Sequence, residues 1–352
     1  MQELSLFSGP LRQITLIVGS SIFAFLLALS LAPAFIRFLH HHKLGKQLRI
    51  TATTGEAATI FNELHAKKAG TPTMGGILIW GTVILVLLFS RVLSYFGLID
   101  HSLINRNETW LPIFTLITTA LLGLLDDYIN IKGKSKGLAV KPKMFWLLVF
   151  ATIGASWFYY KLGFNSIHLP GFGDFQIGLW YIPLFIFVIS GTANAVNFTD
   201  GLDGLAGGLL IIAFGGFAVI AFVKGLFILS AFCSIIVGAL LAFLWYNVPP
   251  AKFYMGDTGA LALGATLGVI AMMTDSAVAL VMIGAIFVIE TLSVIIQLTS
   301  KKLFGRKVFL IAPIHHHFEK LGWSEATVVM RFWIVGGMFA AIGLILRLAG
   351  KF

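Results

Sequence analysis

Long apolar runs dominate this chain and limit how it can fold. They are about 18–25 residues long, close to the roughly 20 residues that a helix needs to cross a bilayer. Of the 352 residues, 58% are hydrophobic and only 11% are charged, whereas about 25% of the residues in a soluble domain are charged. Because a soluble fold cannot bury this much apolar surface, the runs predict an all-α polytopic membrane protein.

The runs predict about ten membrane spans in one continuous domain. The expected spans are residues 15–38, 74–95, 110–127, 144–161, 179–196, 205–223, 226–246, 259–273, 277–300 and 325–348. The first run is too long for the apolar region of a cleavable signal peptide, so we expect it to remain as a span. The lone cysteine, Cys233, lies inside an apolar run, where a small buried hydrophobic side chain is the simplest interpretation.

Lysine and arginine sort the loops into two faces. When successive loops are assigned alternately, one face receives 17 of the 25 basic residues. The segments of this face are 37–73, 128–143, 197–204, 247–258 and 301–324. Cytoplasmic loops carry an excess of Lys and Arg, so we expect this face to be cytoplasmic and both termini to lie outside the cytoplasm. The same bias explains the net charge of +10 without nucleic acid binding.

Aspartates gather on the same face. Five of the eight in the chain fall there, in or beside apolar helices: Asp126, Asp127, Asp200, Asp203 and Asp257. Ionised groups are costly in such places and are usually functional. The basic residues alone defined the face, so the gathering of the acids is separate support for a site.

Asp126 and Asp127 are adjacent carboxylates at the end of an apolar run. Their repulsion in a partly dry setting would be relieved by a divalent cation, a shared proton or nearby lysines. Carboxylate oxygens suit Mg²⁺, which commonly combines one or two carboxylates with substrate phosphates. The alternative is a polar helix end that is solvated by the basic loop after it.

The segment from Asn194 to Gly204 joins two spans through a polar turn. Asn194, Asn197, Asp200 and Asp203 follow one another at intervals of three, which places the first two on one side of a helix end. A simple turn needs fewer side chains of this kind, so the segment favours a binding role.

Three glycine-containing motifs begin helices at the predicted cytoplasmic face: Thr71–Gly76, Gly204–Gly208 and Gly256–Gly259. Helix N-termini have free backbone N–H groups that favour anions, phosphate in particular. Together with the aspartates and lysines, these motifs predict a diphosphate substrate with Mg²⁺. For the third motif, an ordinary N-cap at Asp257 or Thr258 is an equally simple alternative.

Two histidine runs and one intramembrane carboxylate complete the candidates. His315, His316 and His317 lie in a predicted loop without the spacing of a zinc site, so contact with phosphate or sugar is favoured. The run at 40–42 has no glycine or carboxylate neighbour, which favours anchoring at the membrane interface. Glu290, within a predicted span, is a functional candidate by default, with a structural hydrogen bond to another helix as the alternative.

These motifs resemble the phospho-N-acetylmuramoyl-pentapeptide transferase family. The resemblance rests on six segments in the same order: residues 70–76, 126–128, 197–205, 255–259, 290–297 and 315–317. It implies transfer of phospho-N-acetylmuramoyl-pentapeptide from UDP-N-acetylmuramoyl-pentapeptide to undecaprenyl phosphate, giving lipid I and UMP in peptidoglycan synthesis. It also implies Mg²⁺, a location in the bacterial inner membrane with periplasmic termini, and it suggests a homodimer.

The resemblance also assigns roles by motif position. Asp257 would bind Mg²⁺, Asp126 and Asp127 would act as the base for the lipid phosphate and its supporting carboxylate, and His315 joins the catalytic group. Further substrate contacts are expected at Lys68, Thr73, Asn194, Asn197, Asp200, Asp203, Asn247, Tyr254, Gln297, His316 and His317. The whole chain, 1–352, would be one domain with active-site loops at 39–73, 128–143, 197–204, 247–258 and 301–324.

Two alternatives stay open at this point. A polyprenyl-phosphate N-acetylglucosamine-1-phosphate transferase would share the aspartate motifs. A secondary transporter would make use of Glu290 and the glycine-rich spans, although transporters usually bind their substrates near the middle of the membrane.

Overall fold

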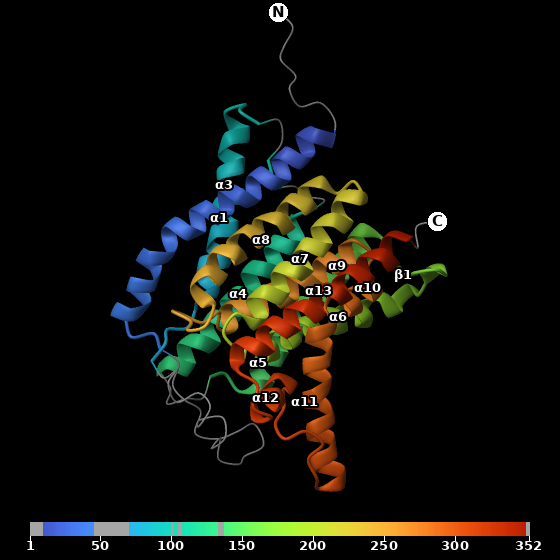
Figure 1. Ribbon diagram of the computed structural model, residues 1–352. Coiled ribbons are helices and arrows are strands. Elements are labelled where there is room, and N and C mark those ends of the chain that lie inside the picture. The colour runs from blue at the N-terminus through green and yellow to red at the C-terminus, as the bar shows by residue number, and fades with distance from the viewer. Residues whose placement is uncertain (1–9, 46–69, 100–101, 105–107, 133–136, 350–352) are drawn as a thin grey trace, which may run out of the picture.

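Helices form nearly all of the regular structure in this computed structural model, and they pack side by side as a bundle (Figure 1). The structure describes residues 10–45, 70–99, 102–104, 108–132 and 137–349. Its helices are α1 (Pro10–His41), α3 (Gly76–Tyr95), α4 (Trp110–Lys132), α5 (Val140–Ser156), α6 (Tyr181–Thr199), α7 (Leu205–Val223), α8 (Phe227–Asn247), α9 (Asp257–Met273), α10 (Ala277–Ile283), α11 (Ala285–Phe304), α12 (Ile314–Lys320) and α13 (Glu325–Ala349).

Short elements complete the described part of the chain. A π-helical turn, η2 (Trp157–Lys161), continues α5, and a 3-10 turn, η3 (Gly178–Trp180), precedes α6. Between them, β1 (Ser166–Leu169) and β2 (Gly173–Gln176) pair antiparallel as a hairpin.

The all-α, multi-pass membrane fold is confirmed. Within the described ranges, seven helical segments are long and apolar enough to cross a membrane: α1, α3, α4, η3 with α6, α7, α8 and α13. Helix α9 is apolar but shorter, at 17 residues. Each predicted span overlaps helix over most of its length, while the total of ten spans and the side on which the termini lie stay predictions.

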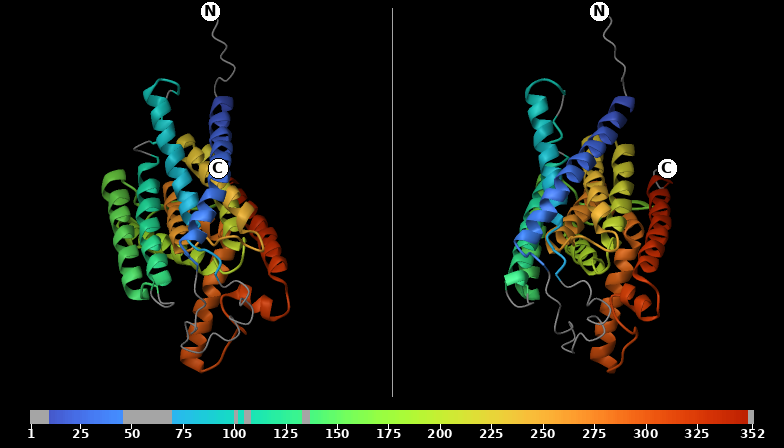
Figure 2. Two further views of the ribbon diagram at one scale, coloured as in Figure 1. Left: turned by 90° about the vertical axis from the view of Figure 1, so that its left-hand side faces the viewer. Right: turned by 60° about the vertical axis from the view of Figure 1, so that its left-hand side comes forward.

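The predicted span at 277–300 is wrong as a single helix. Helices α10 and α11 meet at Gly284 and are bent by 83° relative to each other. Helix α11 therefore leaves the bundle and extends beyond the other helices (Figures 1 and 2). The apolar pattern did not reveal this break, because a single glycine is tolerated within a helix and α10 and α11 are both apolar at their junction.

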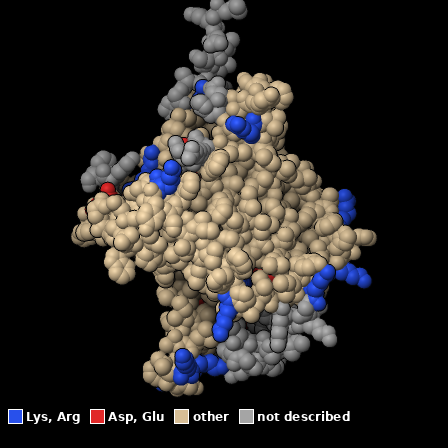
Figure 3. Space-filling model, turned by 180° about the vertical axis from the view of Figure 1, so that it is seen from behind, with Lys and Arg blue, Asp and Glu red and all other residues tan. Residues whose placement is uncertain are grey.

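Exposed apolar side chains cover much of the outside of the bundle. Examples are Leu26, 56% exposed on α1, and Ile334, 64% exposed on α13. Figure 3 shows one face of the molecule with a broad band almost free of charged side chains. Such a surface would be a liability in water, and it matches the apolar solvent that the sequence predicts.

Small residues allow the helices that carry the polar motifs to approach one another closely. A Cβ atom at Gly123 of α4 would overlap the backbone carbonyl of Asp257, at the start of α9. A Cβ at Gly264 of α9 would lie 2.6 Å from the carbonyl oxygen of Thr192 in α6. Glycines at helix contacts are typical of membrane bundles. They bring the end of α4, the end of α6 and the beginning of α9 together.

The bundle has two polar ends. At the Asp257 end, α4 and α6 finish and α3, α5, α7 and α9 begin. At the hairpin end, the β1–β2 hairpin lies against the turn between α9 and α10, where the backbone N–H of His168 donates to Asp275 Oδ1 at 3.1 Å. There His168 Nδ1 lies 2.6 Å from Asp174 Oδ1, and Arg347 Nε donates to Ser276 Oγ at 3.0 Å.

Candidate active site

A carboxylate pair and a lysine form the centre of the Asp257 end. Lys143, in the first turn of α5, places Nζ 3.3 Å from Asp126 Oδ2 and also contacts Asp257 Oδ2. Asp126 lies in the last part of α4 and Asp257 begins α9. The side chains of Asp126, Lys143 and Asp257 are 11%, 15% and 20% exposed. Two mostly buried carboxylates therefore converge on a single cation.

Asn197 extends this centre from a fourth helix. Its Nδ2 donates to Asp257 Oδ1 at 2.8 Å, so the end of α6 contacts the beginning of α9. Asp257 is therefore held through one oxygen by Asn197 and through the other by Lys143. The structure thus brings together three of the residues that the sequence predicted, Asp126, Asn197 and Asp257.

Asp127 has a different environment from Asp126. Its two carboxylate oxygens accept hydrogen bonds from the backbone N–H groups of Asp257 and Thr258, at 3.2 and 3.1 Å. A carboxylate in this position satisfies free N–H groups and the positive end of the helix dipole. Asp127 therefore caps α9, while Asp126 faces Lys143. The two adjacent carboxylates have separate roles.

Several glycine N–H groups of these motifs are used within the protein, and only the described N–H groups without such a partner could serve an anion. The N–H groups of Gly75 and Gly76 donate to the carbonyls of Tyr254 and Met255, at 2.7 and 2.8 Å. Gly204 N–H donates to Asn247 Oδ1 at 3.0 Å. Since these three donors are bonded within the protein, Gly75, Gly76 and Gly204 serve the contacts between loops, and an anion role for the motifs stays a prediction.

Gly256 shows why glycine is needed at this end. Its φ of 73° lies in the left-handed region, and a Cβ there would be 2.5 Å from Asp127 Oδ2 and 2.7 Å from Thr73 Oγ1. The Thr73 hydroxyl is buried and has no hydrogen-bond partner among the described residues. A buried hydroxyl without a partner is uncommon. It marks a position where a ligand atom or water would be stabilised, next to the cap of α9.

Two further polar side chains of the 194–204 segment, Asn194 and Asp203, bind other parts of the protein. Asn194 Nδ2 donates to the carbonyl of Ser190 at 2.7 Å within α6. Asp203 Oδ2 accepts from the N–H of Ala251 at 3.0 Å, and so ties the turn after α6 to the loop after α8. These contacts give Asn194 and Asp203 structural roles, and their predicted substrate contacts stay untested.

Asn247 joins the same two loops. Its Oδ1 accepts from Gly204 N–H at 3.0 Å, and its Nδ2 donates to the carbonyl of Phe253 at 2.8 Å. Tyr254 follows, with its backbone N–H donating to the carbonyl of Pro72 at 2.8 Å. Asp200 is half-buried and directly follows α6, which ends at Thr199. Lys68 lies outside the described residues.

The second histidine run belongs to a short helix, α12, and not to a loop. The Nδ1 atom of each ring has its own contact within the protein. His315 Nδ1 lies 3.0 Å from Glu290 Oε2, and His316 Nδ1 lies 2.7 Å from Glu319 Oε2. His317 Nδ1 accepts from the backbone N–H of Leu310 at 3.2 Å. The three rings therefore do not converge on one point.

Gln297 of α11 holds the segment that returns to α12. Its Oε1 accepts from the N–H groups of Val308 and Phe309, at 3.1 and 2.9 Å, and its Nε2 donates to the carbonyl of Phe309 at 2.9 Å. With three hydrogen bonds to this segment, Gln297 holds the chain that leads into the histidine run against α11. Contact with substrate, as predicted, would involve the remaining N–H alone.

Lys143 is a residue that the sequence does not single out. By sequence it is only one of the basic residues that indicate a cytoplasmic loop. Its position at the start of a span, after a glycine and lysine-rich loop, was the available signal. No spacing rule links it to Asp126 or Asp257, because the three meet only through the packing of α4, α5 and α9.

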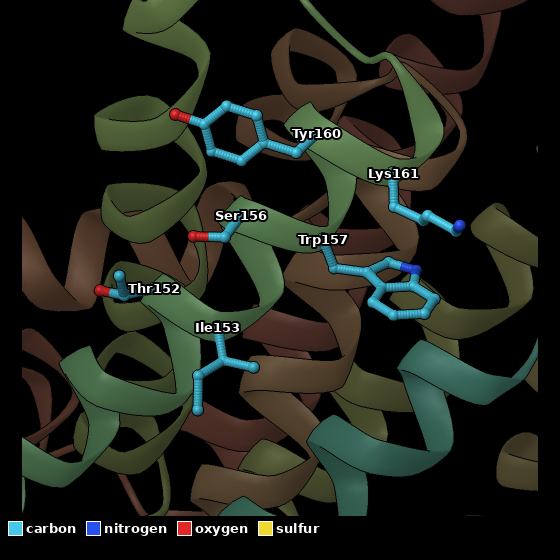
Figure 4. Close-up of a pocket in the computed structure, with 6 residues that line it drawn as sticks. All are labelled: Thr152, Ile153, Ser156, Trp157, Tyr160 and Lys161. Carbon is cyan, nitrogen blue, oxygen red and sulfur yellow. The ribbon is translucent and has the colours of Figure 1, made fainter.

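Two other features lie away from this centre. Among the residues that the structure describes, one group of three metal-ligand side chains has its ligand atoms within 4.8 Å of one another: His168, Asp174 and Asp275. It belongs to the hairpin end. A hollow formed by Thr152, Ile153, Ser156, Trp157, Tyr160 and Lys161 lies along α5 and η2, toward the opposite end of α5 from Lys143 (Figure 4).

Comparisons with known proteins agree with these motifs. The family model described as glycosyl transferase family 4 matches residues 109–275. A signature described as phospho-N-acetylmuramoyl-pentapeptide-transferase signature 1 matches residues 68–79.

Whole-chain relatives carry the same description. A phospho-N-acetylmuramoyl-pentapeptide-transferase of Geobacillus sp. (strain WCH70) is 42% identical over 327 residues, which are 92% of this chain and 95% of the relative. Its counterpart in Oceanobacillus iheyensis is 43% identical, over 91% and 94% of the two chains. That of Chloroflexus aurantiacus is 40% identical, over 92% and 88%.

Proposed function

The chain belongs to the phospho-N-acetylmuramoyl-pentapeptide-transferase family, and from this premise we propose the reaction that it carries out. It transfers phospho-N-acetylmuramoyl-pentapeptide from UDP-N-acetylmuramoyl-pentapeptide to undecaprenyl phosphate. The products are lipid I, which stays in the membrane, and UMP. The observation that carries this proposal is the convergence of Asp126 and Asp257 on Lys143 at one end of a membrane bundle.

The transfer is a displacement at phosphorus. A phosphate oxygen of the lipid attacks the β-phosphorus of the donor, and the bond from that phosphorus to the bridging oxygen breaks. UMP leaves with the electron pair of that bond. Because such transfers need little covalent chemistry from the protein, positioning and neutralisation of phosphate charge are the main tasks of the site.

Asp126 is the better candidate for the base that accepts the proton of the lipid phosphate. Asp127 is already engaged in capping α9 with both oxygens, whereas Asp126 Oδ2 faces the ammonium of Lys143. The backbone N–H of Leu138 donates to the other oxygen of Asp126 and fixes the orientation of its carboxylate. Asp127 would support the reaction by holding Asp257 at the start of its helix.

The donor set fits a hard divalent cation. Asp126 and Asp257 each direct an oxygen at the same ammonium group, so both can approach one cation, and the buried Thr73 hydroxyl lies beside the cap of α9. Mg²⁺ held mainly by Asp257 would neutralise charge on the diphosphate and on the departing UMP. Lys143 would then be available to a phosphate oxygen as a charge-assisted donor.

The orientation follows from the same end. The described parts of the segments that together hold 17 of the 25 basic residues adjoin this end, so we place the Asp257 end at the cytoplasmic face of the bacterial inner membrane. The whole chain would act as one transferase domain, and association as a homodimer is proposed from the family resemblance alone. A transporter would need its site near mid-membrane, whereas the residues of this centre lie at helix ends.

Donor choice tests the proposal. Purified protein would be given undecaprenyl phosphate with either UDP-N-acetylmuramoyl-pentapeptide or UDP-N-acetylglucosamine, and released UMP would be measured. We expect UMP only from the first donor. Turnover of the N-acetylglucosamine donor alone would assign the chain to the related transferase, and uptake of either compound into vesicles without UMP release would support a transporter.

A further inference from the structure

Glu290 and His315 form a pair that the proposed chemistry leaves unexplained. Glu290 lies on α11 and His315 in the first turn of α12, and both side chains are fully buried. Glu290 Oε2 and His315 Nδ1 are 3.0 Å apart. This approach is an ion-pair contact without hydrogen-bond geometry, and the two carboxylate oxygens and two ring nitrogens have no hydrogen-bond partner in the described part of the chain. Each group therefore depends on the other.

We propose that Glu290 is a positioning residue that holds His315 in its Nδ1–H form and directs Nε2 at the turn after α6. This inference rests on the proposed function and on the family resemblance, which alone assigns His315 to the catalytic group. It addresses the choice left by the sequence, because the 3.0 Å contact of Glu290 is made to a histidine of the predicted site.

The identity of the partner fixes the position of the proton. An ionised carboxylate oxygen has no hydrogen to offer, and a nitrogen lone pair only 3.0 Å from it would be repelled, so we assign the ring hydrogen to Nδ1. In a neutral ring, Nε2 then has the free lone pair. His317 shows the opposite arrangement: its Nδ1 accepts from Leu310 N–H, so its Nε2 carries the hydrogen. The run therefore contains both an acceptor and a donor ring.

The free nitrogen of His315 is directed at the polar turn between α6 and α7. A Cβ at Gly201 would overlap His315 Nε2, so this ring position exists only because residue 201 has no side chain. Gly201 directly follows Asp200, at the end of the helix that carries Asn197. Asn197 in turn donates to Asp257. Glu290 thus contacts Nδ1 of His315, while Nε2 of the same ring faces Gly201 in the turn next to the candidate site.

The arrangement is that of a carboxylate behind an imidazole, which orients general acid–base residues in many enzymes. A contact that only fixes α12 against α11 would look the same in the structure. The two roles differ in what a substitution of Glu290 changes. Loss of a purely structural contact would lower stability and substrate affinity, whereas loss of a positioning residue would lower turnover, and only through His315.

The hairpin end offers a matched control. His168 Nδ1 and Asp174 Oδ1 form a similar pair, 2.6 Å apart, remote from the site. Glu290→Gln and Asp174→Asn remove one carboxylate charge each from a histidine pair. We expect Glu290→Gln to lower kcat for UMP release by about tenfold or more with KM for the UDP donor within about twofold, and Asp174→Asn to leave both near wild type.

Two further variants separate positioning from packing. Glu290→Asp keeps the charge and should recover part of the lost turnover. When His315 is replaced by alanine, adding Glu290→Gln should cause no further loss, because Glu290 acts through that ring. Losses that multiply in the double variant, or wild-type kcat in Glu290→Gln, would overturn the proposal. Thermal unfolding in detergent would show whether each variant is folded.

A spectroscopic measurement decides the question without activity. In protein with ¹⁵N-labelled histidine, nitrogen chemical shifts report which ring nitrogen carries hydrogen, and the His315 signals are those that disappear in His315→Ala. We expect His315 to be protonated at Nδ1 in the wild-type protein. Protonation at Nε2 alone would refute the inference even if the enzyme is active. Protonation at Nδ1 without UMP release would refute the proposed function instead.

Discussion

The two polar ends of the bundle contain similar side chains and use them differently. At the Asp257 end, Asp126 and Asp257 share one cation, Lys143, and all three are mostly buried. At the hairpin end, Asp174 is 63% exposed and contacts the ring of His168, while Asp275 accepts from the backbone of that residue. One end directs two mostly buried carboxylates at one lysine, and the other uses its carboxylates to tie a hairpin to a turn.

The comparison shows that grouping of ligand-type side chains is a weak indicator of a site. The hairpin end has the tighter group, with three ligand atoms within 4.8 Å. The Asp257 end is distinguished by its setting. Glycine contacts bring helix ends together there, the Thr73 hydroxyl is buried without a partner among the described residues, and residues matched by the family signature begin α3.

The largest expected loss of activity comes from replacing Asp126 or Asp257, the two carboxylates that contact Lys143. Asp257→Ala and Asp126→Asn should each lower UMP release by about 10³-fold or more, because the cation site or the base is lost. The variants should remain folded, as judged by thermal unfolding in detergent. Near-normal turnover in either variant would remove that residue from the mechanism and weaken the contrast between the two ends.

Lys143 gives a sharper test, since the sequence did not single it out. Lys143→Met keeps the length of the side chain but removes its charge, and we expect UMP release to fall about 10²-fold. Lys141→Met, on the exposed side of the same helical turn, is the matched control and should have little effect. Equal losses in both variants would indicate a general charge effect in place of a specific contact.

Asp127 and Asp126 can be separated by stability. Asp127→Ala removes both acceptors from the first N–H groups of α9, and should lower the free energy of unfolding by about 1–2 kcal/mol. Its activity should fall less than that of Asp126→Asn. If Asp127→Ala is fully inactive at unchanged stability, the roles of the two carboxylates are reversed.

A substitution at the hairpin end should lower the free energy of unfolding and leave the activity of the folded protein unchanged. Asp275→Asn weakens a hydrogen bond to the backbone of His168 and should cost about 1 kcal/mol or less of unfolding free energy. Activity per folded molecule should stay within about twofold of wild type. A tenfold loss of kcat without unfolding would show that this end takes part in the reaction.

Cys233 should give the smallest effect. It is fully buried in α8, away from both polar ends, and Cys233→Ala removes one small atom from the core at a cost of about 1 kcal/mol. Cys233→Ala or Cys233→Ser should therefore retain UMP release. Loss of activity in a folded variant would contradict the assignment of Cys233 as a packing residue.

Helix positions were predictable because apolar run length reports membrane crossing directly. The convergence of Asp126 and Asp257 was also predictable, since alternating loops bring distant residues to one face. The bend at Gly284 could not be read from the sequence, because both halves of the broken helix are apolar where they meet. The length of an apolar run does not report the angle at which a broken helix continues, so the course of α11 away from the bundle was not predictable.

The roles of individual polar side chains were harder to predict. Asn247, Asp203 and Gln297 bind backbone groups of other loops, and such partners are defined only by the folded chain. Their residue types suggested ligand contact equally well. Lys143 was obscured for a related reason, because a lysine in a basic loop also serves membrane orientation.

The most direct test of the central claim is exchange of label between UMP and the UDP-linked donor. Purified protein would be incubated with radiolabelled UMP, UDP-N-acetylmuramoyl-pentapeptide and undecaprenyl phosphate, with and without Mg²⁺. The account predicts exchange that requires Mg²⁺ and is lost in Asp257→Ala. Exchange that persists in that variant, or no exchange by the folded wild-type protein, would contradict the assignment of the Asp257 end as the active site.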